Sequence, residues 1–121
     1  MSRAQSTLEA QFLTILAAYA PDVPAPVAEF RYARPRLFRA DFSWPEQGLL
    51  AEVEGGVFSR GAHGRGSGVE TDCERARFAA MHGYRVMRFT RKFMDENPQG
   101  VALTVRTALA WRPSKQAEGS E

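Results

Sequence analysis

The chain has 121 residues, of which 44% are apolar and 25% charged, so one folded domain is expected and wholesale disorder is excluded. The net charge is only +2, yet all but two of the 16 basic residues are arginines, which suit phosphate; a GC-rich genome would give the same bias. A single cysteine, Cys73, excludes internal disulfides and four-cysteine zinc sites, and the lack of a long apolar run or signal pattern predicts a cytoplasmic protein.

Helical spacing of apolar residues predicts a first helix from Ser6 to Ala20. Ser6 and Glu9 have the spacing of a capping box, which would give Glu9 a structural role at the start of the helix. Three prolines between residues 21 and 26 end this helix, and the alternating residues after them predict a strand from Val27 to Tyr32.

Residues 37–55 predict a hairpin, in which two alternating strands are joined by a turn at Pro45–Gly48. On the first strand the even positions 38, 40, 42 and 44 are apolar and are expected on one face, with the polar odd positions on the other. The pairing taken around this turn is that of Trp44 with Leu49.

This register places two acids, Asp41 and Glu52, directly opposite each other, and opposed like charges predict a compensating cation. Two such carboxylates hold a hard divalent ion such as Mg²⁺, and a main-chain carbonyl such as that of Val53 would add an oxygen ligand. The alternative is a solvent-facing sheet edge whose acids are neutralised by Arg39 and Arg36. Glu54 would either add a ligand or pair with Arg39 across the hairpin, and the pattern does not decide between them.

The glycine-rich stretch from Gly55 to Gly68 predicts a flexible loop that carries His63 between Arg60 and Arg65. Such a loop would fold over a nucleic-acid backbone, with the arginines on phosphates and His63 near the scissile group. A solvent-exposed loop without function is the alternative. The glycine spacing fits neither the phosphate-loop nor the dinucleotide motif, which excludes nucleotide binding.

A second capping-box spacing predicts a helix from Thr71 to His82, with Cys73, Ala76 and Ala80 on its apolar side. A strand from Tyr84 to Thr90 follows, and the strand–helix–strand order predicts a parallel crossover. Asn97 and Pro98 resemble an N-cap and first helical position, which predicts a last helix to about Trp111. We therefore expect one domain over residues 1–112 and a disordered polar tail over residues 113–121.

Four segments carry a family resemblance: D-F-S-W-P-E-Q-G-L-L-A-E-V-E-G-G, G-A-H-G-R-G, D-C-E-R and G-Y-R-V-M-R-F-T. In this order they resemble the PD-(D/E)XK nuclease superfamily, and more narrowly small phage and bacterial endonuclease-like proteins related to very-short-patch repair endonucleases. The resemblance extends over roughly residues 6–109. It implies an α/β fold with a restriction-endonuclease-like core: helix, three strands, helix and strand around a mixed central sheet, with a C-terminal helix.

The resemblance also implies roles for individual acids. Asp41 and Glu52 match the metal-binding positions of the motif, and Glu9 matches an acid that several branches use as an additional ligand or to orient water. Glu54 departs from the pattern, because it stands where the motif has a lysine that positions the attacking water.

In related proteins a basic residue of the following helix or a nearby histidine replaces that lysine, which implies Arg75 or His63 here. An arginine would stabilise charge but would not act as a general base, because its pKa exceeds about 12. The implied activity is that of a Mg²⁺-dependent DNA endonuclease, with Mn²⁺ as a substitute, acting in phage or bacterial DNA repair, recombination or processing.

The implied catalytic residues are Asp41, Glu52, Glu54, His63 and Arg75, and the implied DNA contacts come from Arg39, Arg60, His63, Arg65 and Arg77. The implied partners are DNA and either a second copy of the chain or a phage or bacterial protein, in the cytoplasm of a bacterial or phage-infected cell. The alternative is a nucleic-acid-binding or adaptor protein that keeps the fold but has impaired catalysis through Glu54.

Overall fold

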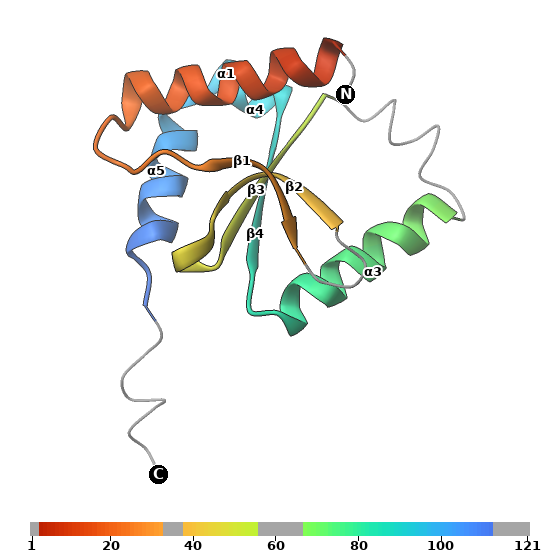
Figure 1. Ribbon diagram of the computed structural model, residues 1–121. Helices are drawn as coiled ribbons and strands as arrows, with labels where there is room; N and C mark the ends of the chain where they lie inside the picture. The colour runs from red at the N-terminus through yellow and green to blue at the C-terminus, as the bar shows by residue number, and fades with distance from the viewer. Residues whose placement is uncertain (1–2, 33–37, 56–66, 113–121) are drawn as a thin grey trace.

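A four-stranded mixed sheet lies at the centre of the molecule, with helices on both faces (Figure 1). The computed structural model describes residues 3–32, 38–55 and 67–112, so the tail expected to be disordered lies outside the described residues. The strand order is β1-β2-β3-β4; β2 is antiparallel to β1 and β3, whereas β4 is parallel to β3. In chain order the elements are α1 (Arg3–Tyr19), β1 (Val27–Tyr32), β2 (Phe38–Trp44), a 3-10 helix (Pro45–Gln47), β3 (Leu49–Glu54), α3 (Ser67–Met81), β4 (Arg85–Thr90), α4 (Arg91–Glu96) and α5 (Pro98–Ala110).

The hairpin of β2 and β3 has the predicted register, with Trp44 opposite Leu49. The turn is the 3-10 helix Pro45–Gln47, and Gly48 ends it with a φ of 62°. This left-handed conformation costs glycine little, because it has no side chain. A Cβ atom at Gly48 would lie 2.8 Å from the main-chain oxygen of Gly83, so the close approach of the two chain segments also requires glycine.

Beyond this turn the strands separate at the candidate site. The β2–β3 ladder ends at the pair Phe42–Ala51, one residue before the predicted opposition of Asp41 and Glu52. The β1–β2 ladder skips the pair formed by Glu29 and Asp41, although the pairs on either side are present. Glu29 has a φ of 53°, which is unusual for a residue with a side chain and interrupts the regular strand.

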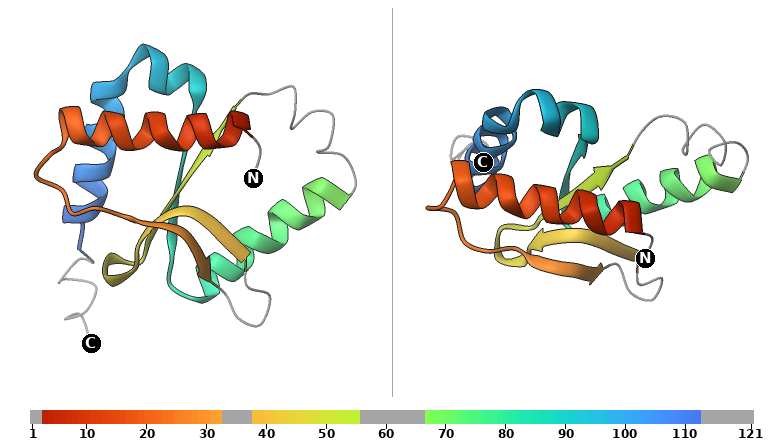
Figure 2. Two further views of the ribbon diagram at one scale, coloured as in Figure 1. Left: turned by 45° about the horizontal axis from the view of Figure 1, so that its top comes forward. Right: turned by 90° about the horizontal axis from the view of Figure 1, so that it is seen from above.

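This interruption changes the face on which the side chains of β2 lie. Phe42 and Trp44 belong to the larger core, which α1, α4 and α5 cover, whereas Ala40 and Phe38 pack in the smaller core under α3. Figure 2 shows α1, α4 and α5 together on one side of the sheet and α3 on the other. The expectation that all four even positions share one face is therefore wrong, because the strand pair is kinked at Glu29 and Asp41.

Both long helices begin earlier than expected. α1 starts at Arg3 and α3 at Ser67, so Ser6 and Thr71 lie inside helices and neither forms the predicted capping box. In α1 the turn before Ser6 is tied to the sheet through the side chain of Gln5, which contacts Asp41 and the main-chain oxygen of Val53. In α3 the residues Val69 and Glu70, which precede Thr71, are exposed, so packing does not explain the earlier start of this helix.

The packing side of α3 also differs from the prediction. Cys73, Ala76 and Ala80 are exposed, whereas Ala79 is buried and Phe78 is half-buried against the smaller core. The side of α3 that packs against the sheet is therefore the one with Phe78 and Ala79, and the predicted side with Cys73, Ala76 and Ala80 is wrong.

The C-terminal part of the sheet follows the prediction closely. β4 is parallel to β3, and Asn97 caps α5 by accepting a hydrogen bond from the main-chain nitrogen of Gly100. The sequence did not predict α4, which starts directly after β4 and is capped by Thr90.

β4 is an edge strand: among the described residues it pairs only with β3. In the same part of the chain, no helix is long and apolar enough to cross a membrane.

Candidate functional site

Asp41 lies where β2 separates from its neighbours, and its carboxylate points towards α1. One oxygen, Oδ2, accepts hydrogen bonds from the main-chain nitrogen of Val53 at 2.9 Å and from Nε2 of Gln5 at 3.3 Å. The other, Oδ1, is 3.5 Å from the guanidinium of Arg39. Only 8% of the residue is exposed. The β2–β3 ladder ends before Val53, and the carboxylate of Asp41 accepts the hydrogen bond from the Val53 N–H in place of a main-chain acceptor on β2.

Three oxygen atoms converge on the side-chain nitrogen of Gln5. They are Oε2 of Glu9 at 3.3 Å, Oδ2 of Asp41 at 3.3 Å and the main-chain oxygen of Val53 at 3.2 Å. Gln5 and Glu9 reach this point together because they are four residues apart on α1 and so share one side of the helix. An amide nitrogen has only two hydrogens for these three acceptors, and all three distances exceed the usual value of about 2.9 Å.

The electrostatics of this cluster disfavour a second negative charge. Burial raises the pKa of Asp41, and the nearby carboxylate of Glu9 raises it further. The hydrogen bond from Val53 and the charge of Arg39 act in the opposite direction without reversing the shift in pKa. The cluster is therefore rich in oxygen and poor in positive charge, a condition that a bound proton or cation relieves.

Glu52 lies on the other face of the sheet. Its Oε2 accepts a hydrogen bond from Arg75 of α3 at 2.7 Å, and its Oε1 is 3.2 Å from Nε of Arg88 on β4. On β3 the side chains alternate, so Glu52 points with Leu50 towards α3 while Val53 points towards α1. The expectation that Glu52 and Asp41 converge on one point is therefore not met. The side chains of β2 stop alternating between the two faces of the sheet at Asp41, whereas those of β3 continue to alternate through Glu52.

Arginines link the two acids across the end of the sheet. Arg75 donates to Glu52 and also, at 3.0 Å, to the main-chain oxygen of Arg39, whose own guanidinium approaches Asp41. The guanidinium of Arg75 further lies over the ring of Phe38, 5.6 Å from its centroid. Arg75 thus fixes Glu52 and the Arg39 segment of β2 in one arrangement.

A groove of about 510 Å³ lies between α3 and β4 on the side of Glu52. Its lining includes Tyr32, Glu52, Arg75, Tyr84, Val86 and Arg88. Burial raises the pKa of Tyr32, so its hydroxyl stays protonated at neutral pH. In this groove Glu52 is paired with Arg75 and Arg88, which gives it a different character from the oxygen cluster at Asp41.

The remaining predicted site residues are dispersed. Glu54 is half-buried on β3, opposite Thr90 of β4, and Arg77 is exposed on α3. His63, Arg60 and Arg65 lie outside the described residues. Within residues 3–32, 38–55 and 67–112, no group of three or more His, Cys, Asp or Glu side chains lies close enough to share a metal ion.

Gln5 is the site residue that sequence reasoning missed. The first helix was expected to begin at Ser6, which leaves Gln5 outside it; because α1 begins at Arg3, Gln5 and Glu9 lie on the same side of the helix as buried Leu8 and Phe12. A pair of polar residues at such a spacing predicts a shared partner on the sheet.

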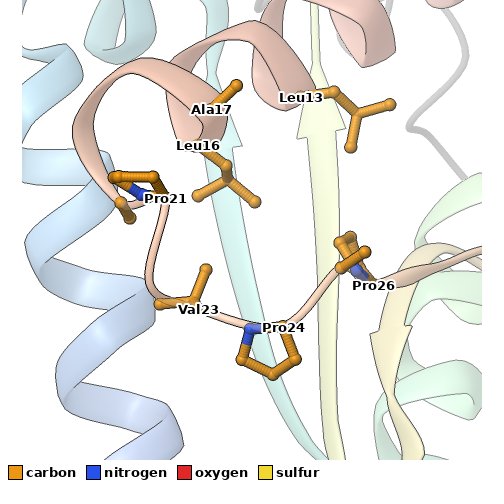
Figure 3. A pocket seen from close by; sticks show the side chains of 9 residues that line it. Leu13, Leu16, Ala17, Pro21, Val23, Pro24 and Pro26 are labelled. Atoms are coloured by element: carbon orange, nitrogen blue, oxygen red, sulfur yellow. The ribbon is translucent and has the colours of Figure 1, made fainter.

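A second hollow, of about 190 Å³, lies at the C-terminal end of α1, away from the oxygen cluster. Figure 3 shows its lining, which combines Leu13 and Leu16 of the helix with Val23 and Pro24 of the following segment. All of its lining side chains are apolar, so it offers no group for acid–base chemistry or for binding a cation.

Comparisons with protein-family models, with curated proteins and with solved structures find no match to this chain.

Proposed function

We propose that the protein is a divalent-cation-dependent DNA endonuclease with a restriction-endonuclease-like core, in which Glu9, Asp41 and the main-chain oxygen of Val53 bind the cation. One observation carries this proposal: these three oxygens surround a single nitrogen atom, that of the Gln5 side chain. They come from α1, β2 and β3, which meet where the β2–β3 ladder opens.

The donor set suits a hard cation. Carboxylate and carbonyl oxygens are the ligands that Mg²⁺ and Mn²⁺ prefer, and both ions keep several waters when the protein supplies only a few ligands. Two carboxylates in a buried position also need the positive charge that the amide of Gln5 does not supply. When bound, such an ion offsets negative charge on a phosphate and favours deprotonation of a water.

The protein's own residues would position a phosphodiester beside this cluster. Arg39 has a partly exposed guanidinium next to Asp41, where it can donate two hydrogen bonds to phosphate oxygens. Arg75 acts through its contact with the main chain of Arg39 and is a positioning residue. Glu52 in turn orients Arg75, which gives this acid a function although it lies on the opposite face.

The direct test incubates supercoiled plasmid and branched DNA with the protein in Mg²⁺, in Mn²⁺ or in EDTA. Asp41→Asn and Glu9→Gln should each reduce cleavage by roughly 100-fold or more, since each removes an anionic ligand while keeping the side-chain shape. Glu46→Gln is the matched control, because Glu46 is an exposed acid at the other end of the hairpin. Cleavage in EDTA, or full activity of Asp41→Asn, would refute the proposal.

A second candidate function is that of a nucleic-acid-binding protein without catalysis. It is favoured by the engagement of Glu52 with Arg75 and Arg88, and by an acid, Glu54, at the position where a nuclease of this kind has lysine. This candidate predicts DNA binding that weakens steeply with salt but is unaffected by Mg²⁺ and by Asp41→Asn. A mobility-shift titration on the samples of the cleavage assay distinguishes the two functions.

A further inference from the structure

We infer that Gln5 is an internal competitor of the cation, whose amide nitrogen takes the cation's position and must leave before the cation binds. The inference rests on the proposed cation site but adds a residue and a property to it. It predicts that the native side chain lowers the affinity of the protein for divalent ions.

The distances make joint occupancy impossible. The nitrogen of Gln5 is 3.2 to 3.3 Å from its three acceptors, the spacing of long N–H···O hydrogen bonds. Mg²⁺ binds oxygen at about 2.0–2.1 Å, so the oxygens must draw in by roughly 1 Å around an ion at the same point. An ion there would also lie against the amide hydrogens, which carry partial positive charge.

Gln5 is placed to move. It is half-buried and lies in the first turn of α1, where the main chain is the least constrained part of a helix. Its long side chain can rotate out towards solvent while Glu9, one turn further along, stays in place. The carbonyl end of the same amide would then be available to a water of the cation.

The affinity of variants provides the test, with Mn²⁺ as the probe in isothermal titration calorimetry. Gln5→Ala removes the competing hydrogen bonds and should bind Mn²⁺ about tenfold more tightly than the native protein, as expected for loss of about one net hydrogen bond to a charged group. Gln5→Glu replaces the donor nitrogen by an oxygen in a side chain of similar shape. This variant should bind Mn²⁺ at least as tightly as the native protein does. Gln11→Ala is the matched control, because Gln11 lies on the same helix but bonds to Asp95.

A second measurement follows the native side chain directly. On addition of Mg²⁺, the side-chain amide signals of Gln5 in a proton–nitrogen NMR spectrum should shift at a concentration that matches the calorimetric affinity, while those of Gln11 stay in place. The signals are assigned by their loss in Gln5→Ala and Gln11→Ala.

The outcomes separate the inference from the proposed function. Equal Mn²⁺ affinity of the native protein, Gln5→Ala and Gln5→Glu, together with loss of binding in Asp41→Asn, would overturn the inference and leave the cation site intact. No binding by either the native protein or Gln5→Ala, or binding that persists in Asp41→Asn, would overturn the cation site itself. Binding by Gln5→Ala where the native protein binds weakly or not at all supports both.

Discussion

Two substitutions of Asp41 should differ in their effects on stability. The Oδ2 atom accepts a hydrogen bond from the buried main-chain nitrogen of Val53 at 2.9 Å. Asp41→Ala leaves this N–H without an acceptor, and such a buried unsatisfied group costs about 1–3 kcal/mol. Asp41→Asn keeps an oxygen in the same place, so it should avoid this cost.

The charge of Asp41 adds a dependence on pH. Burial and the proximity of Glu9 raise the pKa of Asp41 above its value in the unfolded chain. Below the unfolded pKa of about 3.9 the carboxyl is protonated in both states and carries no penalty. As the pH rises through the raised pKa of the folded state, the native protein loses stability, whereas Asp41→Asn does not ionise and keeps it.

Urea denaturation at pH 4 and pH 7, in EDTA, measures both effects. At pH 7 we expect Asp41→Asn to be at least as stable as the native protein and about 1–3 kcal/mol more stable than Asp41→Ala. The advantage of Asp41→Asn over the native protein should shrink towards pH 4. If Asp41→Asn were as destabilised as Asp41→Ala at pH 7, the roles assigned to Val53 and Glu9 would be wrong.

Two further predictions concern regions outside the site. Gly48→Ala should destabilise the fold by about 1–2 kcal/mol or more in urea denaturation, because the residue has a left-handed φ of 62° and its Cβ would meet the oxygen of Gly83; an unchanged midpoint would contradict this. Hydrogen bonding to Arg106 lowers the pKa of Asp22 to about 2. In an NMR titration, Arg106→Ala should return this pKa towards 3.8, so the stabilisation from the pair is present above that pH and is lost as the pH falls towards 2.

The features of the fold that could be predicted from the sequence are those with a local cause. The turn at residues 45–48 sets the register of the hairpin, and Asn97 followed by proline sets the start of α5. The starts of α1 and α3 were wrong: the turn before Ser6 is held to the sheet by Gln5, whereas Val69 and Glu70 before Thr71 are exposed and no packing explains the earlier start of α3. Packing between distant segments has no local signature.

The candidate site illustrates the same limit. Asp41 follows from the hairpin pattern and Glu9 from a family resemblance, but the separation of Asp41 from Glu52 depends on a single left-handed residue, Glu29. Nothing in a glutamate predicts a positive φ, so strict alternation was the natural expectation. Gln5 could not be predicted as part of the site because it precedes Ser6, the expected start of the first helix.

β4 is an edge strand among the described residues, and its sequence bears on pairing between copies of the chain. An exposed strand edge invites pairing with the same strand of another molecule, which starts aggregation. The sequence of β4, R-V-M-R-F-T, contains two arginines and no acid, and long charged side chains on an edge strand hinder such pairing. Arg88 is also held by Glu52, the acid that Arg75 contacts, so replacing Arg88 would alter both the edge strand and the arginine network of the site.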